Sequence, residues 1–286
     1  MTTPQNIVAL IFDFDDTLID DTTTRFLESR GVPAQRFWRS DVDGLVLQGW
    51  DPTLAYLSLI LDMAEPGGSL EGIGNAQLRE FGASLEPYPG IADLFQDLRG
   101  IAREHRLSSP AVEFYVVSGG LEEIIRGTTL APLFDGIWGC RFAEDGGQIK
   151  RIMNMISFTE KTKYLFAINK GQETVVRSEP YAVNRAVEQE NRRVPFRNMI
   201  YVGDGVTDVP CFSLVSHFEG MAFGVFDPAK ADSPRRAWEQ LAAPRRVVSL
   251  NRPCYGRGDE LGALLRVAVK SVCMDLDLQA RQAAGR

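Results

Sequence analysis

Three short runs of apolar residues in this chain each end abruptly in a polar or glycine-containing turn. They span Ile7–Phe12, Phe114–Val117 and Met199–Val202, and none alternates regularly with polar positions. Uninterrupted apolar runs of this length are typical of strands that are buried on both faces of a parallel sheet. The later apolar stretches Met221–Phe226 and Val247–Leu250 could add further strands.

The segments between these runs have helical spacing. After the turn at Pro89-Gly90, the apolar residues Ile91, Leu94, Phe95 and Leu98 form a stripe on one face of a predicted helix. Strands that alternate with such helices predict an α/β fold with a doubly wound parallel sheet.

One stretch breaks this alternation, because residues 21–86 contain no convincing strand. Three helices are predicted in it instead, at Arg25–Arg30, Ala34–Leu47 and Thr53–Met63. We interpret the stretch as a small helical cap inserted into an α/β core that is formed by residues 1–20 and 87–286. The alternative is that these helices cover one face of a single domain.

Composition narrows the class of function. The 286 residues carry a formal net charge of −7, which argues against broad binding to nucleic acid or to an anionic membrane. The four cysteines are scattered without a Cys-x-x-Cys pair, so neither a zinc site nor a disulfide framework is expected. With no signal sequence and no apolar stretch long enough to span a bilayer, the sequence predicts a cytoplasmic protein. Nothing in it indicates an oligomeric state.

Polar residues follow each of the three apolar runs. They are Asp13, Asp15, Asp16 and Thr17 after the first, Ser118, Gly119 and Gly120 after the second, and Asp204 and Asp208 after the third. Ligands of open α/β sheets bind beyond the carboxyl ends of the strands, so these residues are expected to share one crevice. Several carboxylates in one place repel each other unless a cation compensates them, and hard oxygen ligands suit Mg²⁺.

The spacing of Asp13 and Asp15 favours two different roles in phosphoryl transfer. One carboxylate can attack phosphorus and form an aspartyl-phosphate, while the other protonates the leaving group and then activates water. Ser118 can donate a hydrogen bond to a phosphate oxygen. A metal ion and a lysine would neutralise charge on the transferred group. The two histidines, His105 and His217, are remote from these turns.

Four segments together resemble the motifs of the haloacid dehalogenase superfamily. They are Asp13-Phe14-Asp15-Asp16-Thr17-Leu18, Val116-Val117-Ser118-Gly119-Gly120, a downstream lysine, and Gly203-Asp204-Gly205-Val206-Thr207-Asp208. Their order and their positions at strand ends make the resemblance specific, and it covers the core from Ile7 to about Leu214. It implies a Mg²⁺-dependent hydrolase of phosphate monoesters that acts on a small phosphorylated metabolite.

The resemblance also implies a role for individual residues. Asp13 would be the nucleophile and Asp15 the general acid/base, while Ser118 and Gly119 would bind phosphate. Mg²⁺ would be held by Asp13, the main-chain carbonyl of Asp15 and Asp204, with Asp208 in support. Thr17 is expected to form a hydrogen bond near the nucleophile and the phosphate.

Two residues compete for the position of the motif lysine. Lys161 is followed by Leu165 and Ile168, the apolar stripe expected when the lysine opens a helix, whereas Lys163 has only Ala167 at the equivalent offset. We therefore favour Lys161 as the phosphate-binding lysine.

Within the superfamily, the chain is most similar to phosphoserine phosphatases, which share the Ser-Gly-Gly motif and the helical insertion. Members commonly carry Gly or Ser where this chain has Asp16, which adds a negative charge beside the site. The acid that reads the substrate amine in that group aligns with Thr22, although Asp20 and Asp21 lie close by. The interval from Lys161 to Asp204 is also longer, so phosphoserine is not assigned as the substrate.

Three other functions compete with a phosphatase. A dehalogenase shares the aspartate nucleophile but has no need of an acid at Asp15 or of a full metal loop. A phosphomutase keeps every core motif, and the sequence does not separate it from a phosphatase. A binding protein on the same fold would have no use for an acid/base pair such as Asp13 and Asp15.

Overall fold

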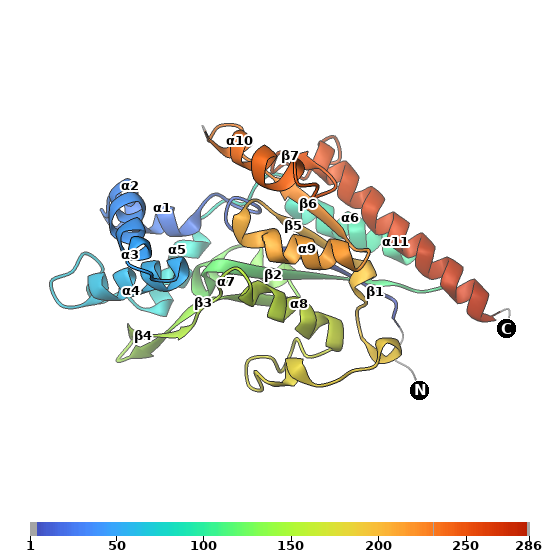
Figure 1. Ribbon diagram of the computed structural model, residues 1–286, viewed down its shortest axis with the longest axis horizontal. Coiled ribbons are helices and arrows are strands. Elements are labelled where there is room, and N and C mark those ends of the chain that lie inside the picture. The colour runs from blue at the N-terminus through green and yellow to red at the C-terminus, as the bar shows by residue number, and fades with distance from the viewer. Residues whose placement is uncertain (1–4, 231, 285–286) are drawn as a thin grey trace.

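A seven-stranded, mostly parallel sheet forms the centre of the computed structural model, which describes residues 5–230 and 232–284. The strands lie in the order β4-β3-β2-β1-β5-β6-β7, and every neighbouring pair is parallel except β3 and β4 (Figure 1). Their bounds are β1 Ile7–Phe12, β2 Ala111–Leu121, β3 Gly136–Asp145, β4 Gln148–Asn154, β5 Met199–Gly203, β6 Met221–Val225 and β7 Leu250–Asn251. This arrangement confirms the predicted α/β fold.

Helices cover both faces of the sheet. Phe114 of β2 stacks on Phe95 of α6, with ring centroids 3.8 Å apart. The next residue, Tyr115, points to the opposite face and stacks on Trp138, which contacts Tyr164 of α8. Successive side chains of a strand point to opposite faces, so the aromatic contacts place α6 and α8 on different sides. The helices of the core are α6 Ile91–Glu104, α7 Glu122–Gly127, α8 Glu160–Lys170, α9 Val209–His217, α10 Ser233–Ala237 and α11 Glu260–Ala284.

The register of the three central strands brings their carboxyl ends to one edge. Phe12, the last residue of β1, pairs with Val116 of β2 on one side and with Val202 of β5 on the other. The backbone N–H of Asp13 donates to the carbonyl of Val202 at 2.8 Å. The ends of the three apolar runs in β1, β2 and β5 therefore lie side by side, as predicted.

Two features of the sheet differ from the sequence-based expectation. The predicted strand Val247–Leu250 is wrong in its bounds, because the regular strand comprises only Leu250 and Asn251. Val248 still donates to the carbonyl of Ala222, so the preceding residues approach β6 without a continuous ladder. The hairpin of β3 and β4 was not predicted, since Gly139 and Arg141 interrupt its apolar pattern.

Residues 21–86 form helices without a strand, as expected. The elements are α1 Thr22–Ser29, α2 Ala34–Arg36, the π-helical segment Phe37–Val42, α3 Asp43–Leu47, α4 Pro52–Ala64 and α5 Asn75–Ala83. Of these, α5 was missed, because its sequence carries few apolar residues. The division into a core and a separate cap domain stays a prediction.

Helix α5 lies directly against α7 of the core, and two glycines permit this close approach. A Cβ atom added at Gly82 of α5 would lie 2.0 Å from the carbonyl oxygen of Ile124. One added at Gly127 of α7 would lie 1.9 Å from the carbonyl oxygen of Arg79. The two helix backbones therefore touch where the insertion meets the core.

We predict that Gly82→Ala destabilises the protein by about 1–3 kcal/mol, because the new methyl group collides with backbone that cannot move aside easily. Gly100→Ala is the matched control. Gly100 also lies in a helix, and its added Cβ meets nothing within 4 Å. The control should stabilise by roughly 0.5–1 kcal/mol through helix propensity. Chemical denaturation measures both, and equal effects would show that α5 is not held closely against α7.

Candidate active site

A buried lysine joins two of the carboxylates at the edge of the sheet. Lys161 lies in the first turn of α8 and is 1% exposed. Its Nζ atom is 3.0 Å from Oδ1 of Asp13 and 2.7 Å from Oδ1 of Asp208. Burial alone would lower the pKa of Lys161, but the two carboxylates outweigh that effect and raise it. The lysine is therefore held as a cation between the turns after β1 and β5.

Asp208 is fixed from three sides. Besides Lys161, the hydroxyl of Tyr201 donates to its Oδ1 at 2.6 Å, and the N–H of Gly205 donates to its Oδ2 at 3.3 Å. A Cβ atom at Gly203 would lie 2.5 Å from Oδ2, so this position has room only for glycine. Asp208 is fully buried, and these hydrogen bonds hold its carboxylate in one orientation. The carboxylate in turn orients Lys161.

Asp13, Asp204 and Asp208 form a group that could hold a metal ion. One carboxylate oxygen from each lies within 4.8 Å of the others. Burial, followed by the charges of Asp13 and Asp208, raises the pKa of Asp204 well above its usual value. Such crowding is relieved by a cation, and a set of carboxylate oxygens suits Mg²⁺ better than a softer metal. The residues present therefore fit the expected ion.

Asp15 lies beside this cluster in a different environment. Its Oδ1 accepts a hydrogen bond from the N–H of Thr22 at 2.8 Å. A Cβ atom on Gly120 would lie 2.3 Å from its Oδ2, so Asp15 packs directly against the carboxyl end of β2. Burial and, next, the charge of Asp21 raise the pKa of Asp15 to about 8. A carboxyl group with this pKa is mostly protonated at neutral pH and can donate a proton.

Ser118 and Gly119 lie near the carboxyl end of β2, so the turn expected directly after Val117 is wrong: the strand continues to Leu121, with a shift of its register to β3 between Val117 and Leu121. Ser118 is 1% exposed, and its Oγ accepts a hydrogen bond from the N–H of Gly120 at 2.9 Å. Because the hydroxyl acts there as an acceptor, its own proton stays available for a ligand oxygen. The carbonyl of Gly119 accepts a hydrogen bond from the hydroxyl of Tyr56 at 2.6 Å. A residue of α4 thus supports the carboxyl end of β2.

Two more residues named from the sequence are Thr17, expected to contact phosphate, and Lys163, the second candidate for the motif lysine. The hydroxyl of Thr17 is buried and finds no hydrogen-bond partner in residues 5–230 and 232–284, while its carbonyl accepts from Tyr255 at 2.6 Å. Its contact with phosphate stays a prediction. Lys163, the rejected candidate, forms an ion pair with Glu160 at 2.7 Å on the outside of α8.

Sequence reasoning did not single out Tyr56, Tyr201 or Lys230. Tyr201 is the third residue of a buried strand, and an isolated polar group within an apolar run was the only available signal. Tyr56 contacts Gly119 and Lys230 contacts Asp16, in each case across a long interval of sequence. No local sequence pattern therefore marks either residue.

Comparison with known proteins agrees with this arrangement. A family model described as haloacid dehalogenase-like hydrolase matches residues 10–213. The chain belongs to the haloacid dehalogenase-like hydrolases. An uncharacterised protein of Borreliella burgdorferi is 30% identical over 240 residues, which cover 76% of this chain and 81% of the relative. The resemblance inferred from the four motifs is confirmed.

Solved structures show the same fold. A HAD family hydrolase from Salmonella enterica matches with a TM-score of 0.56 and 14% identity over 93% of this chain and 72% of its own. A phospho-aspartyl intermediate analogue of a phosphoserine phosphatase matches with a TM-score of 0.52 and 13% identity, covering 92% and 99% of the two chains. A substrate-bound phosphoserine phosphatase matches with a TM-score of 0.52 and 14% identity, covering 91% of this chain and 97% of its own.

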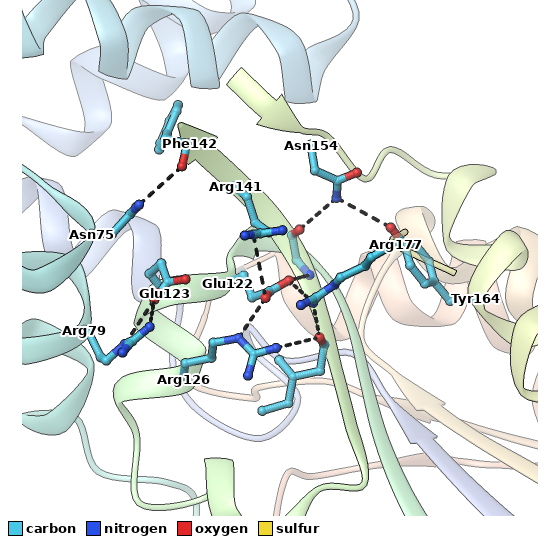
Figure 2. A network of polar contacts seen from close by, with 12 residues as sticks. Asn75, Arg79, Glu122, Glu123, Arg126, Arg141, Phe142, Asn154, Tyr164 and Arg177 are labelled. Atoms are coloured by element: carbon cyan, nitrogen blue, oxygen red, sulfur yellow. Dashed lines mark hydrogen bonds and ion pairs between the residues drawn. The ribbon is translucent and has the colours of Figure 1, made fainter. Parts of the chain in front are cut away.

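In this haloacid dehalogenase-like hydrolase, a network of polar contacts surrounds Glu122, the first residue of α7 (Figure 2). Glu122 is 1% exposed and directly follows Leu121, the last residue of β2. Its carboxylate accepts hydrogen bonds from the N–H of Gly139 at 3.0 Å, from Arg126 at 2.8 Å and from Arg177. One buried side chain thus ties α7 to β3 and to the long segment after α8.

The same network reaches the helical insertion. Arg79 of α5 pairs with Glu123 of α7, and the side-chain amide of Asn75 donates to the carbonyl of Phe142 at 3.3 Å (Figure 2).

Over the part of the chain that the structure describes, no helix is both long and apolar enough to cross a membrane.

We predict that Lys161→Met destabilises this hydrolase by about 3–5 kcal/mol, because two buried carboxylates lose their common partner. Lys163→Met removes a lysine from the same helix, but its ion pair with Glu160 is partly exposed. That control should change the free energy of unfolding by less than about 1 kcal/mol. Urea unfolding without divalent cations measures both. Comparable stabilities would contradict the assignment of Lys161 as the central cation.

Proposed function

We propose that this chain is a Mg²⁺-dependent phosphatase that hydrolyses a small phosphate monoester through an aspartyl-phosphate on Asp13. The observation that supports this most directly is the bridge from Lys161 to Asp13 and Asp208. It joins a candidate nucleophile to a buried cation, while Asp15 and the hydroxyl of Ser118 both lie against Gly120. Family membership and the fold shared with phosphoserine phosphatases are consistent with the proposal.

In the first step, a carboxylate oxygen of Asp13 attacks phosphorus, and the bond from phosphorus to the leaving oxygen breaks. Asp15, which is mostly protonated at neutral pH, gives its proton to that oxygen, so the alcohol departs neutral. Lys161 and Ser118 bind oxygens of the transferred group and stabilise its charge. The product is an aspartyl-phosphate and a deprotonated Asp15.

In the second step, Asp15 removes a proton from water as the water oxygen attacks phosphorus. The bond between phosphorus and Asp13 breaks, which releases inorganic phosphate and restores both carboxyl groups. Asp15 holds the proton in one step and accepts it in the other, so a single residue serves the whole cycle.

Asp13 and Asp204 are the residues most available to hold Mg²⁺, together with the main-chain carbonyl of Asp15. Asp208 would support the site indirectly, because Lys161 and Tyr201 already occupy its Oδ1. When bound, the ion would neutralise charge on the phosphoryl oxygens. Burial and the charge of Asp208 raise the pKa of Asp13 to about 7 against the opposing effect of Lys161. A nearby cation favours the ionised carboxylate that attacks phosphorus.

The surroundings of Thr22 do not favour a substrate that carries an ammonium group. The neighbouring acid Asp21 caps α1, where it accepts hydrogen bonds from the N–H of Thr24 at 2.9 Å and from its hydroxyl at 2.6 Å. Asp20 is paired with Lys230 at 2.8 Å. Both acids near this position are therefore engaged, which supports a phosphate ester other than phosphoserine.

The roles of the two aspartates predict different behaviour of two variants. Asp13→Asn should abolish turnover of p-nitrophenyl phosphate and form no phosphoenzyme, because an amide oxygen is a poor nucleophile. Asp15→Asn should still form phosphoenzyme, since p-nitrophenolate needs little protonation, but hydrolysis of that intermediate should be slower by about 10²–10⁴-fold. Rapid quench with labelled substrate, followed by mass spectrometry of the peptide that carries Asp13, distinguishes them.

Label on any other side chain would sink the proposed mechanism, as would undiminished turnover by Asp13→Asn. If the label passes to a second hydroxyl compound rather than to water, the protein is a phosphomutase.

The metal assignment predicts that Mg²⁺ raises the unfolding temperature and that activity is lost in excess chelator. A ligand at 100 times its dissociation constant stabilises by about 2.7 kcal/mol. Asp204→Asn should remove most of this stabilisation. Asp145→Asn, which changes an exposed carboxylate in the β3–β4 hairpin, should leave it intact. A thermal melt with and without Mg²⁺ measures both variants, and full activity in excess chelator would refute the assignment.

A further inference from the structure

Asp16, which follows the candidate acid/base Asp15, takes an unusual conformation. Its φ angle is 56°, in the left-handed region that non-glycine residues seldom adopt. Asp tolerates this region better than most residues, so the fold can accept it there. This residue nevertheless places a carboxylate next to Asp15 and close to the metal-binding cluster.

A lysine from the segment after β6 compensates this carboxylate. Nζ of Lys230 contacts Oδ1 of Asp16 and lies 2.8 Å from Oδ1 of Asp20. The N–H of Asp21 also donates to Asp16 at 3.2 Å. Asp16 is separated from Lys230 by more than 200 residues of sequence, so a distant segment supplies this charge.

The backbone that carries Lys230 is itself held in place after β6. The N–H of Lys230 donates to the carbonyl of Asp227 at 3.2 Å, and its own carbonyl accepts from Ser233 at 2.9 Å. The hydroxyl of Ser233 in turn accepts from the N–H of Asp227 at 3.1 Å. These bonds tie the backbone of Lys230 to Asp227 and Ser233, so the residue that pairs with Asp16 starts from an anchored position.

The position of Asp16 lets its charge affect the binding of a phosphate ester and of a divalent cation. Its side chain is only 27% exposed, so water screens it incompletely. It lies close enough to Asp204 for the two carboxylates to interact. A free carboxylate at this position would repel a phosphate ester and attract a divalent cation.

We propose that Lys230 is a positioning residue that acts through Asp16: by pairing with this carboxylate, it lets the site admit a phosphate ester despite an additional acid beside the metal cluster. The proposal rests on the proposed phosphatase function for its substrate, but its charge balance is measurable with Mg²⁺ alone. No direct contact of Lys230 with substrate is required.

The test is the variant Lys230→Met, studied at low ionic strength. KM for p-nitrophenyl phosphate should rise about three- to tenfold, on the order expected for one unit charge acting across a partly hydrated site, while kcat changes by less than about twofold. The dissociation constant of Mg²⁺, measured by calorimetry without substrate, should fall by a similar factor. Added salt should diminish both effects. Damage to the fold would weaken both ligands instead of shifting them in opposite directions.

Two further variants connect the effect to Asp16. Asp16→Asn in the Lys230→Met background should restore both constants to within about twofold of the values for Asp16→Asn alone, because it removes the less exposed of the two carboxylates that Lys230 pairs; the other, Asp20, is 46% exposed and better screened by water. Asparagine also tolerates a positive φ angle. Lys230→Arg should behave like the parent protein. Lys163→Met removes a lysine of comparable exposure that pairs with Glu160, and it should change neither constant.

Each outcome bears on one of the two proposals. If the parent protein binds Mg²⁺ but hydrolyses no phosphate ester, the proposed function fails while the Mg²⁺ measurements still test the role of Lys230. If Lys230→Met binds Mg²⁺ no more tightly than the parent, or if Asp16→Asn does not reverse the change, the role proposed for Lys230 is wrong.

Discussion

The bridge from Lys161 to Asp13 and Asp208 is the interaction on which the rest of the site depends. Asp13 follows β1, Asp208 follows β5, and Lys161 opens α8, so three segments far apart in sequence meet at one nitrogen atom. Three carboxylates in a buried space repel each other strongly, and a lysine alone leaves a net negative charge. The remaining charge is what makes the cluster suitable for a divalent cation.

The chain makes this crowding possible by omitting side chains at a few positions. Gly203 and Gly120 leave the space that Asp208 and Asp15 occupy, and each has less than 3 Å between its missing Cβ and a carboxylate oxygen. The motif glycines are thus explained by contact with the acids of neighbouring motifs. Gly82 and Gly127 use the same device at the junction of the helical insertion with the core.

Much of this could be predicted from the sequence because the relevant signals are local. The apolar runs before Asp13, Ser118 and Asp204 mark buried strands, and parallel strands bring their carboxyl ends to one edge. The choice of Lys161 over Lys163 followed from helical periodicity, and the structure places only the former beside Asp13. Contacts made across long sequence distances were not predictable, as with Lys230 and Tyr56. The β3–β4 hairpin escaped detection because its polar contacts, such as Glu122 with Gly139, replace a regular apolar pattern.

The hydrogen bond from Tyr56 to the carbonyl of Gly119 has a mechanical consequence. Tyr56 belongs to α4, whereas Gly119 lies next to Ser118 near the end of β2. Movement of α4 away from β2 must break this bond and would leave the carbonyl of Gly119 with a weaker donor, the thiol of Cys140 at 3.2 Å. A shift of α4 is therefore transmitted directly to the strand segment that carries Ser118.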